Sequence, residues 1–216
     1  MSDCCQAKAR ELSSGEAAFG RVLWVVLAIN GIMFAVEFGA GIAAGSTALM
    51  ADSLDMLGDA AVYGVSLVAL RRSDTWRAGA ALLKGGLMAA FGLGVLGQLA
   101  WHLVTGTMPV AAMMTGFGLA ALGANLVCAA LLLRHRGGDV NMRSTWLCSR
   151  NDVVANLGVL AAAGLVSLTG RQWPDLVVGL IIALLFLRSA LQVLRDALSG
   201  LASRSAERPA APSATP

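Results

Sequence analysis

The stretch that decides the fold is Ser46 to Asp59, which reads STALMADSLDMLGD. It places three carboxylates, Asp52, Asp55 and Asp59, in a run of mainly apolar residues. Offsets of three and seven residues bring all three acids to one stripe of an α-helix. The apolar run continues to Leu70 and is long enough to cross a bilayer. Carboxylates in such a helix must be paired, protonated or bound to a cation.

The composition is that of a polytopic helical membrane protein. Of the 216 residues, 57% are hydrophobic and 13% are charged, whereas a soluble domain carries about 25% charged residues. The four cysteines lack the regular spacing of a disulfide framework. The net charge of +3 is small, and no nucleic-acid partner is expected. The first apolar run exceeds the roughly 7–15 residues of a signal-peptide core, so no cleaved signal is expected.

Six apolar runs predict an all-α fold of six transmembrane helices within residues 20–198. A polar cytoplasmic leader is expected at 1–19 and a disordered tail at 199–216. A tight turn at Gly45-Ser46 separates the first span, about 20–44, from the second, which ends at Leu70. The remaining spans are expected at about 79–104, 110–133, 144–168 and 176–194.

Lys and Arg residues predict the orientation of these spans. They gather in the leader, the tail and two of the loops, whereas the three alternate loops together hold only Arg171. The positive-inside rule therefore places both termini in the cytoplasm. The predicted location is the cell membrane, which in a bacterium is the inner membrane.

A second polar pattern lies on the fifth expected span, where Cys148 and Asp152 are four residues apart, as Asp55 and Asp59 are on the second. Two facing helices could thus present three oxygens and one sulfur to a common point. This is the ligand number of a tetrahedral divalent-metal site, and a thiolate favours a softer metal such as zinc or cadmium. The alternative is that the acids are neutral, hydrogen-bonded packing groups. Three acids on one stripe favour the cation site.

The run from Asn30 to Asp59, NGIMFAVEFGAGIAAGSTALMADSLDMLGD, resembles the first two helices of the cation diffusion facilitator family. The resemblance continues at NMRSTWLCSRND, Asn141 to Asp152, and covers about residues 20–198. It implies a six-helix divalent-metal/proton antiporter, typically dimeric, that exports zinc and related metals. The family marker is His or Asp followed four residues later by Asp, in the second and fifth helices. Asp55 with Asp59, and Cys148 with Asp152, fall on these two pairs.

Further polar residues are candidates for supporting roles. The resemblance places Asn30, Glu37 and Asp52 where family members commonly carry polar or acidic groups, so they are expected along the ion path or beside the ligands. Asn125 and Asn156 are expected to bond between helices or to support the metal ligands. Cys4 and Cys5 are candidates for capturing a soft metal at the cytoplasmic mouth, or are simply a reduced pair on the leader.

The sequence also departs from the family pattern. Cys148 stands where His or Asp is usual, and Arg150 adds a positive charge between the fifth-helix pair. The chain ends soon after the sixth span, so the cytoplasmic domain usual in the family is not part of it. The expectation is a truncated family member.

The predicted function is proton-coupled efflux of a divalent metal, Zn²⁺ or Cd²⁺, by alternating access. The metal is the transported ion, no resident cofactor or enzymatic activity is expected, and the partners are protons, membrane lipid and a second copy in a homodimer. Two alternatives stay open. Asp52, Asp55 and Asp59 also resemble the magnesium-diphosphate motif of integral-membrane prenyltransferases, although no second acidic motif follows. The chain could also be a non-transporting partner of a full-length transporter.

Overall fold

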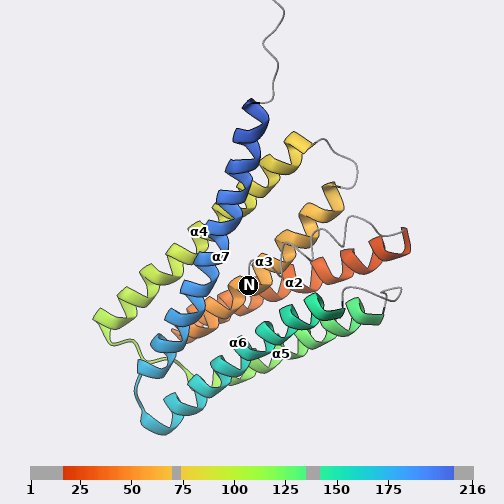
Figure 1. Cartoon of the computed structure of the whole chain (residues 1–216). Coiled ribbons are helices and arrows are strands. Elements are labelled where there is room, and N and C mark those ends of the chain that lie inside the picture. The colour runs from red at the N-terminus through yellow and green to blue at the C-terminus, as the bar shows by residue number, and fades with distance from the viewer. Residues whose placement is uncertain (1–16, 70–73, 135–141, 207–216) are drawn as a thin grey trace, which may run out of the picture.

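The computed structural model describes residues 17–69, 74–134 and 142–206, and the side chains of 21–64, 79–132 and 152–199. These residues form six α-helices and, within the described ranges, no strand. The helices are α2 (Ala17–Ala44), α3 (Thr47–Ala69), α4 (Asp74–Thr105), α5 (Ala111–Arg134), α6 (Met142–Thr169) and α7 (Trp173–Ala206). The predicted all-α, six-helix fold is confirmed (Figure 1).

The helix that carries the acid stripe is the centre of the bundle. The most extensively packed pairs are α2 with α3, α4 with α7, and α5 with α6. Of the six helices, α3 alone contacts each of the other five. In Figure 1, α3 lies between the α4–α7 pair and the α5–α6 pair. The acids therefore lie on the most enclosed helix of the fold.

Three tight turns join the helices at one end of the bundle. Each contains a glycine in the left-handed region: Gly45 (φ 63°), Gly106 (φ 69°) and Gly170 (φ 58°). The N–H groups of Gly106 and Gly170 close the preceding helices with bonds of 2.9 Å to His102 O and Val166 O. Glycine adopts this conformation without the steric cost that a side chain would bring. The predicted turn at Gly45-Ser46 is confirmed.

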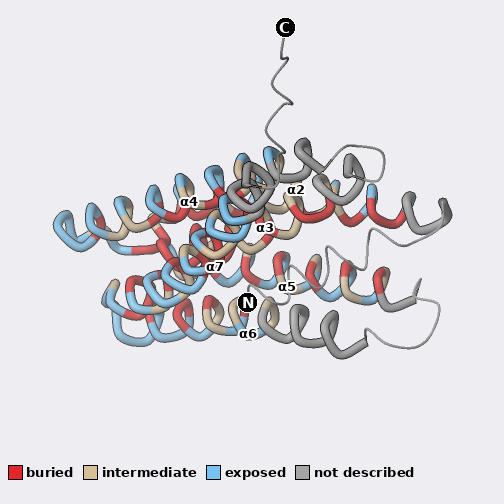
Figure 2. Tube along the Cα trace, turned by 45° about the horizontal axis from the view of Figure 1, so that its top comes forward, coloured by how far each residue is buried: buried red, intermediate tan, exposed pale blue. Residues whose placement is uncertain are grey.

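The surface of the bundle is apolar and its interior carries the polar groups. Large side chains such as Trp24, Ile32, Leu83 and Leu168 are exposed, while Glu37 is fully buried (Figure 2). Five helices are long and apolar enough to cross a membrane: α2, α4, α5, α6 and α7. The sixth helix, α3, has 23 residues and three acids, and its length of about 35 Å matches the ~30 Å bilayer core. The chain is a multi-pass membrane protein.

Two helices extend beyond the spans expected from the sequence. Helix α4 begins at Asp74, inside the predicted charged loop, and α7 continues to Ala206, past the span expected at about 176–194 and into the tail expected from residue 199. The remaining leader and tail, 1–16 and 207–216, lie outside the described residues.

The N-terminus of α3 is held by a carboxylate from α7. The backbone N–H groups of Thr47 and Ala48 donate to Asp175 Oδ2 (2.8 Å) and Oδ1 (3.1 Å). Ser46 Oγ donates to Asp175 Oδ1 (2.5 Å) and accepts from Leu49 N (3.1 Å). The first N–H groups of a helix have no partner within it, and they attract a negative charge. Asp175 therefore fixes the start of α3 against the start of α7.

The close approach of α3 and α7 depends on a glycine. A Cβ atom on Gly179 would lie 2.8 Å from both Ala48 N and Thr47 C. These are backbone atoms, so a larger residue would force the two helices apart.

Helix α4 also contacts the start of α3, through a buried histidine. His102 Nδ1 lies 3.2 Å from Thr47 Oγ1, and its Nε2 lies 2.9 Å from Gln98 Nε2. The His102 ring is 3% exposed, so its polar atoms are satisfied by protein groups. The ends of α3, α4 and α7 are thus tied together by side chains.

Replacement of Asp175 by Asn should destabilise the protein. The amide would present an NH₂ group to the N–H donors of α3 and would remove the negative charge, at a cost of about 1–3 kcal/mol. Unfolding of the purified protein from mild detergent by added denaturing detergent measures this cost. Asp196→Asn is the matched control, because Asp196 is exposed on the same helix. Equal stability of the two variants would contradict the role given to Asp175.

Candidate metal centre

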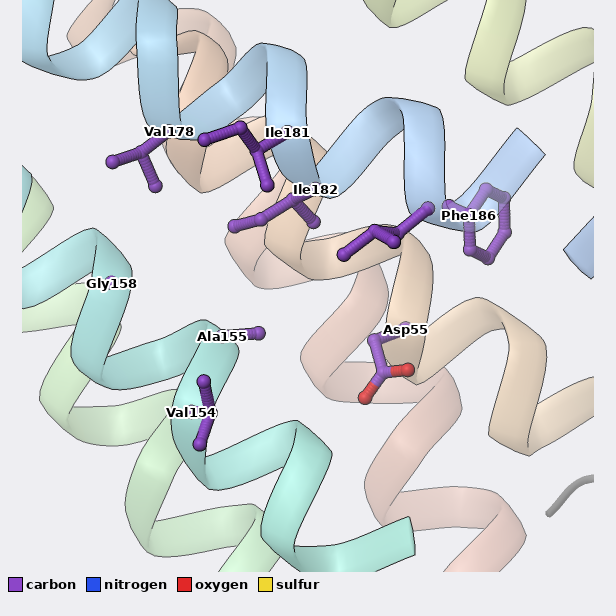
Figure 3. A pocket seen from close by; sticks show the side chains of 9 residues that line it. Asp55, Val154, Ala155, Gly158, Val178, Ile181, Ile182 and Phe186 are labelled. Carbon is purple, nitrogen blue, oxygen red and sulfur yellow. The ribbon is translucent and has the colours of Figure 1, made fainter. Parts of the chain in front are cut away.

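The Asp55 carboxylate lines a cavity between three helices that opens to the surface of the bundle, where Val154, Ile181 and Leu185 are exposed. The cavity measures about 440 Å³ and is lined by residues of α3, α6 and α7. In Figure 3, Asp55 projects from α3 on the side where Val154 and Ala155 of α6 lie, with the labelled side chains of α7 above it. Apart from Asp55, the lining is apolar or glycine: Val154, Ala155, Gly158, Val178, Ile181, Ile182, Leu185 and Phe186. A carboxylate in apolar surroundings strongly favours the approach of a cation.

Asp59 lies one turn further along α3 and is oriented by its own helix. Tyr63 O–H donates to Asp59 Oδ2 at 3.3 Å. The Tyr63 ring is fully buried in an apolar cluster with Val22, Leu23 and Val26 of α2. Because this ring is fixed by packing, its hydroxyl restrains the Asp59 carboxylate.

Asp152 belongs to α6, on the other side of the cavity from α3. It is half-buried and precedes Val154 and Ala155, which line the cavity. The side chains of Cys148 and Arg150 lie outside the described residues, as do Cys4 and Cys5. Among the side chains that the structure describes, no three of His, Cys, Asp or Glu gather closely enough to hold a metal ion. The four-ligand site with Asp55, Asp59, Cys148 and Asp152 therefore stays a prediction.

A chain of buried polar side chains crosses the bundle beside the cavity. Asn156 Nδ2 of α6 donates to Asp52 Oδ2 at 2.8 Å. Asn125 Nδ2 of α5 donates to Asn156 Oδ1 at 3.4 Å. Glu37 of α2 interacts with Asp52 from the other side. Glu37, Asp52 and Asn156 are each at most 1% exposed.

The Glu37 and Asp52 carboxyls are complementary only when one of them carries a proton. With both ionised, Glu37 Oε1, Glu37 Oε2 and Asp52 Oδ1 are buried without a donor among the described groups. A proton on Glu37 would supply a donor for the unsatisfied Asp52 Oδ1. The negative charge of Asp55 acts on both carboxyls. Burial of two adjacent anions in an apolar bundle would be very costly.

Asn30 is separate from this chain of side chains. Its Nδ2 donates to Val26 O at 2.9 Å and to Cys128 Sγ at 3.5 Å. These contacts link α2 to α5 within an apolar cluster. Of the five residues predicted to support the site, the structure thus brings four together, namely Glu37, Asp52, Asn125 and Asn156.

Sequence reasoning did not find the cluster formed by Asp175, Ser46 and His102. Ser46 after Gly45 is a recognisable helix-start signal. Nothing in the sequence indicates that the acceptor for α3 comes from a residue 129 positions away.

The fold and the buried acids define a class of protein. A polytopic helical membrane protein with several carboxylates in its interior is typical of proteins that bind or move ions. The profile of the cation efflux transmembrane domain matches residues 23–202. The chain therefore belongs to the cation efflux family.

Curated relatives share this part of the chain. The zinc transporter ZitB of Escherichia coli is 31% identical over 196 residues, covering 84% of this chain and 62% of ZitB. The metal cation efflux system protein CzcD of Cupriavidus metallidurans is 27% identical, covering 82% and 62%. The cadmium, cobalt and zinc/H⁺–K⁺ antiporter of Bacillus subtilis is 25% identical, covering 85% and 63%. The chain thus spans under two thirds of the length of these relatives.

These matches confirm several expectations. The predicted family and multi-pass membrane location are confirmed, and the family consists of transporters, not enzymes. The prenyltransferase alternative therefore loses its support.

Replacement of Asn156 by Ala should cost more stability than replacement of Asn125 by Ala. Asn156 Nδ2 donates to Asp52 Oδ2, and loss of this donor leaves a buried carboxylate oxygen unsatisfied, at about 1–3 kcal/mol. Asn125 makes a longer bond to a neutral amide and is 9% exposed. The same detergent unfolding titration compares the two variants. Equal losses would show that Asn156 does not hold Asp52 in the way described.

Proposed function

We propose that the protein exports a divalent metal cation, Zn²⁺ or Cd²⁺, from the cytoplasm in exchange for protons. The observation that carries this proposal is the Asp55 carboxylate at an otherwise apolar cavity between α3, α6 and α7, in a chain of the cation efflux family. A single acid in such a cavity attracts a cation but does not complete its coordination. The remaining ligands would be Asp59 on α3 with Cys148 and Asp152 on α6.

The relatives support the choice of ion. Their names describe a zinc transporter, a metal cation efflux protein and an antiporter of cadmium, cobalt and zinc. Three carboxylates and one thiolate suit zinc and cadmium better than the alkali ions, which prefer neutral oxygens. The metal is the substrate of the transporter and does not remain bound.

The transport step follows from the charge of the ligands. Metal binding requires deprotonated carboxylates and a thiolate, so the incoming ion displaces protons. Alternating access would then open the site to the other side, where protons compete for the ligands and release the metal. The cavity is lined by α3, α6 and α7, so movement of the α5–α6 pair relative to α3 and α7 would change access to Asp55.

Replacement of Asp59 by Ala should strongly reduce metal transport. The variant loses one of four ligands, and uptake should fall by about tenfold or more because a three-ligand site holds the metal weakly. The measurement is uptake of zinc or cadmium by inverted vesicles that contain the purified protein under a pH gradient. Asp196→Asn is the control, since Asp196 is exposed and distant in sequence from the proposed ligands.

Two outcomes would contradict this proposal. Transport by Asp59→Ala at the parent rate would remove Asp59 from the site. Absence of transport by the parent, together with no metal resistance in a sensitive host that lacks its own exporters, would favour a non-transporting partner protein.

Replacement of Cys148 by Asp should change the selectivity of transport. Four hard oxygens hold cadmium less well than three oxygens and a thiolate, so cadmium uptake should fall several-fold more than zinc uptake. The ratio of the two uptake rates in the same vesicles is the measurement. Cys128→Ala removes a different buried thiol, in the α2–α5 core, and should leave the ratio unchanged. An unchanged ratio in Cys148→Asp would exclude the thiolate as a ligand.

A further inference from the structure

We propose that Glu37 and Asp52 form a proton-binding pair that is separate from the metal ligands. The pair would hold one shared proton between α2 and α3 when the metal site is empty, and would release it when metal binds at Asp55. The release step rests on the proposed function, whereas the shared proton does not.

The first argument is the set of unsatisfied oxygens. Glu37 is fully buried and Asp52 is 1% exposed. Three of their four carboxyl oxygens have no donor among the described groups when both are ionised. One proton bound between them supplies the missing donor and removes one of two adjacent buried charges. Paired carboxyl groups that share a proton are a known solution to this problem.

The second argument is the position of the amides, which determines which carboxyl stays ionised. Asn156 donates to Asp52 Oδ2 at 2.8 Å. Its own carbonyl oxygen accepts from Asn125, which orients the Asn156 NH₂ group towards Asp52. A donor stabilises the ionised form of the acid that accepts it. Asp52 is therefore the acceptor of the pair, and Glu37 is the carboxyl that carries the proton.

The third argument is that the pair does not suit a metal ion. A divalent cation needs several oxygen, nitrogen or sulfur ligands. The amide next to Asp52 presents N–H, not oxygen, and no third His, Cys, Asp or Glu of the described part completes a ligand group. A proton needs only one donor atom and one acceptor atom, which the two carboxyls provide.

Asp55 provides the connection to the metal site. It lies one turn from Asp52 on α3, and its charge acts on both Glu37 and Asp52. The described groups that approach the pair from α5 and α6 are the neutral amides Asn125 and Asn156. From α4 and α7, Met88 and Phe186 pack with Ala51 and Leu54 of α3 in an apolar cluster. Asp55 is therefore the charge whose neutralisation would change the proton affinity of the pair.

The coupling has a definite sign. An ionised Asp55 repels a second negative charge on the pair, so it favours the shared proton. A divalent metal at Asp55 reverses the local charge and favours proton release. Metal and proton would thus exclude each other without binding to the same atoms.

The shared proton can be detected without any metal. A protonated carboxyl gives an infrared C=O stretch that is absent from a carboxylate. In metal-free protein at neutral pH, this band should be lost in Glu37→Gln and retained in Asp196→Asn. Because Gln keeps the shape of Glu, the fold should be retained. A wild-type spectrum without the band, or a band unchanged in Glu37→Gln, would overturn the proposal.

The coupling is tested by counting protons released on metal binding. Zinc titrations by calorimetry, in buffers of different ionisation enthalpy, give the number of protons released per zinc. Glu37→Gln should still bind zinc but release roughly one proton fewer than the parent. Equal release would overturn the coupling. If the parent binds no zinc, the proposed function fails, while the infrared band still decides whether Glu37 and Asp52 share a proton.

Discussion

The fold depends on one carboxylate that accepts hydrogen bonds from the start of a neighbouring helix. Asp175 of α7 accepts from two backbone N–H groups of α3 and from Ser46, and it thereby replaces the hydrogen bonds that a helix start lacks. Because α3 contacts every other described helix, its position affects all of them. Close packing at Gly179 and the His102 contact with Thr47 restrain the same end. The position of α3 along α7 is therefore fixed, and with it the position of the three acids that α3 carries.

The interior combines groups that are satisfied with groups that are not. Asn156, Asn125, Ser46 and Asp175 all have hydrogen-bond partners, as buried polar groups in stable proteins do. Glu37 and one oxygen of Asp52 have no donor among the described groups unless a proton is bound. Natural proteins retain such costly arrangements mainly at functional sites. The contrast separates the groups that hold the helices together from the pair that we propose to bind a proton.

Much of this arrangement was predictable from the sequence, because length and apolarity alone specify a membrane helix. The six spans, the turn at Gly45 and the special role of α3 follow from apolar runs interrupted by Asp52, Asp55 and Asp59. Other features depend on which helices meet. Asn30 and Asn156 look alike in sequence, yet one bonds Cys128 and the other Asp52. The pairing of Asp175 with Ser46 likewise requires the three-dimensional packing of α7 against α3.

The three acids of α3 lie on one helix face but have different surroundings. Asp52 is committed to Asn156 and Glu37, Asp55 faces the cavity, and Asp59 accepts from Tyr63. Spacing of three and four residues keeps them within electrostatic reach, since charges in a low-dielectric interior interact strongly over one helical turn. The Asn156 bond crosses from α3 to α6, two of the three helices that line the cavity. Any movement of α6 that changes access to Asp55 would therefore also change the donor available to Asp52, so that access to the metal site and proton affinity would change together.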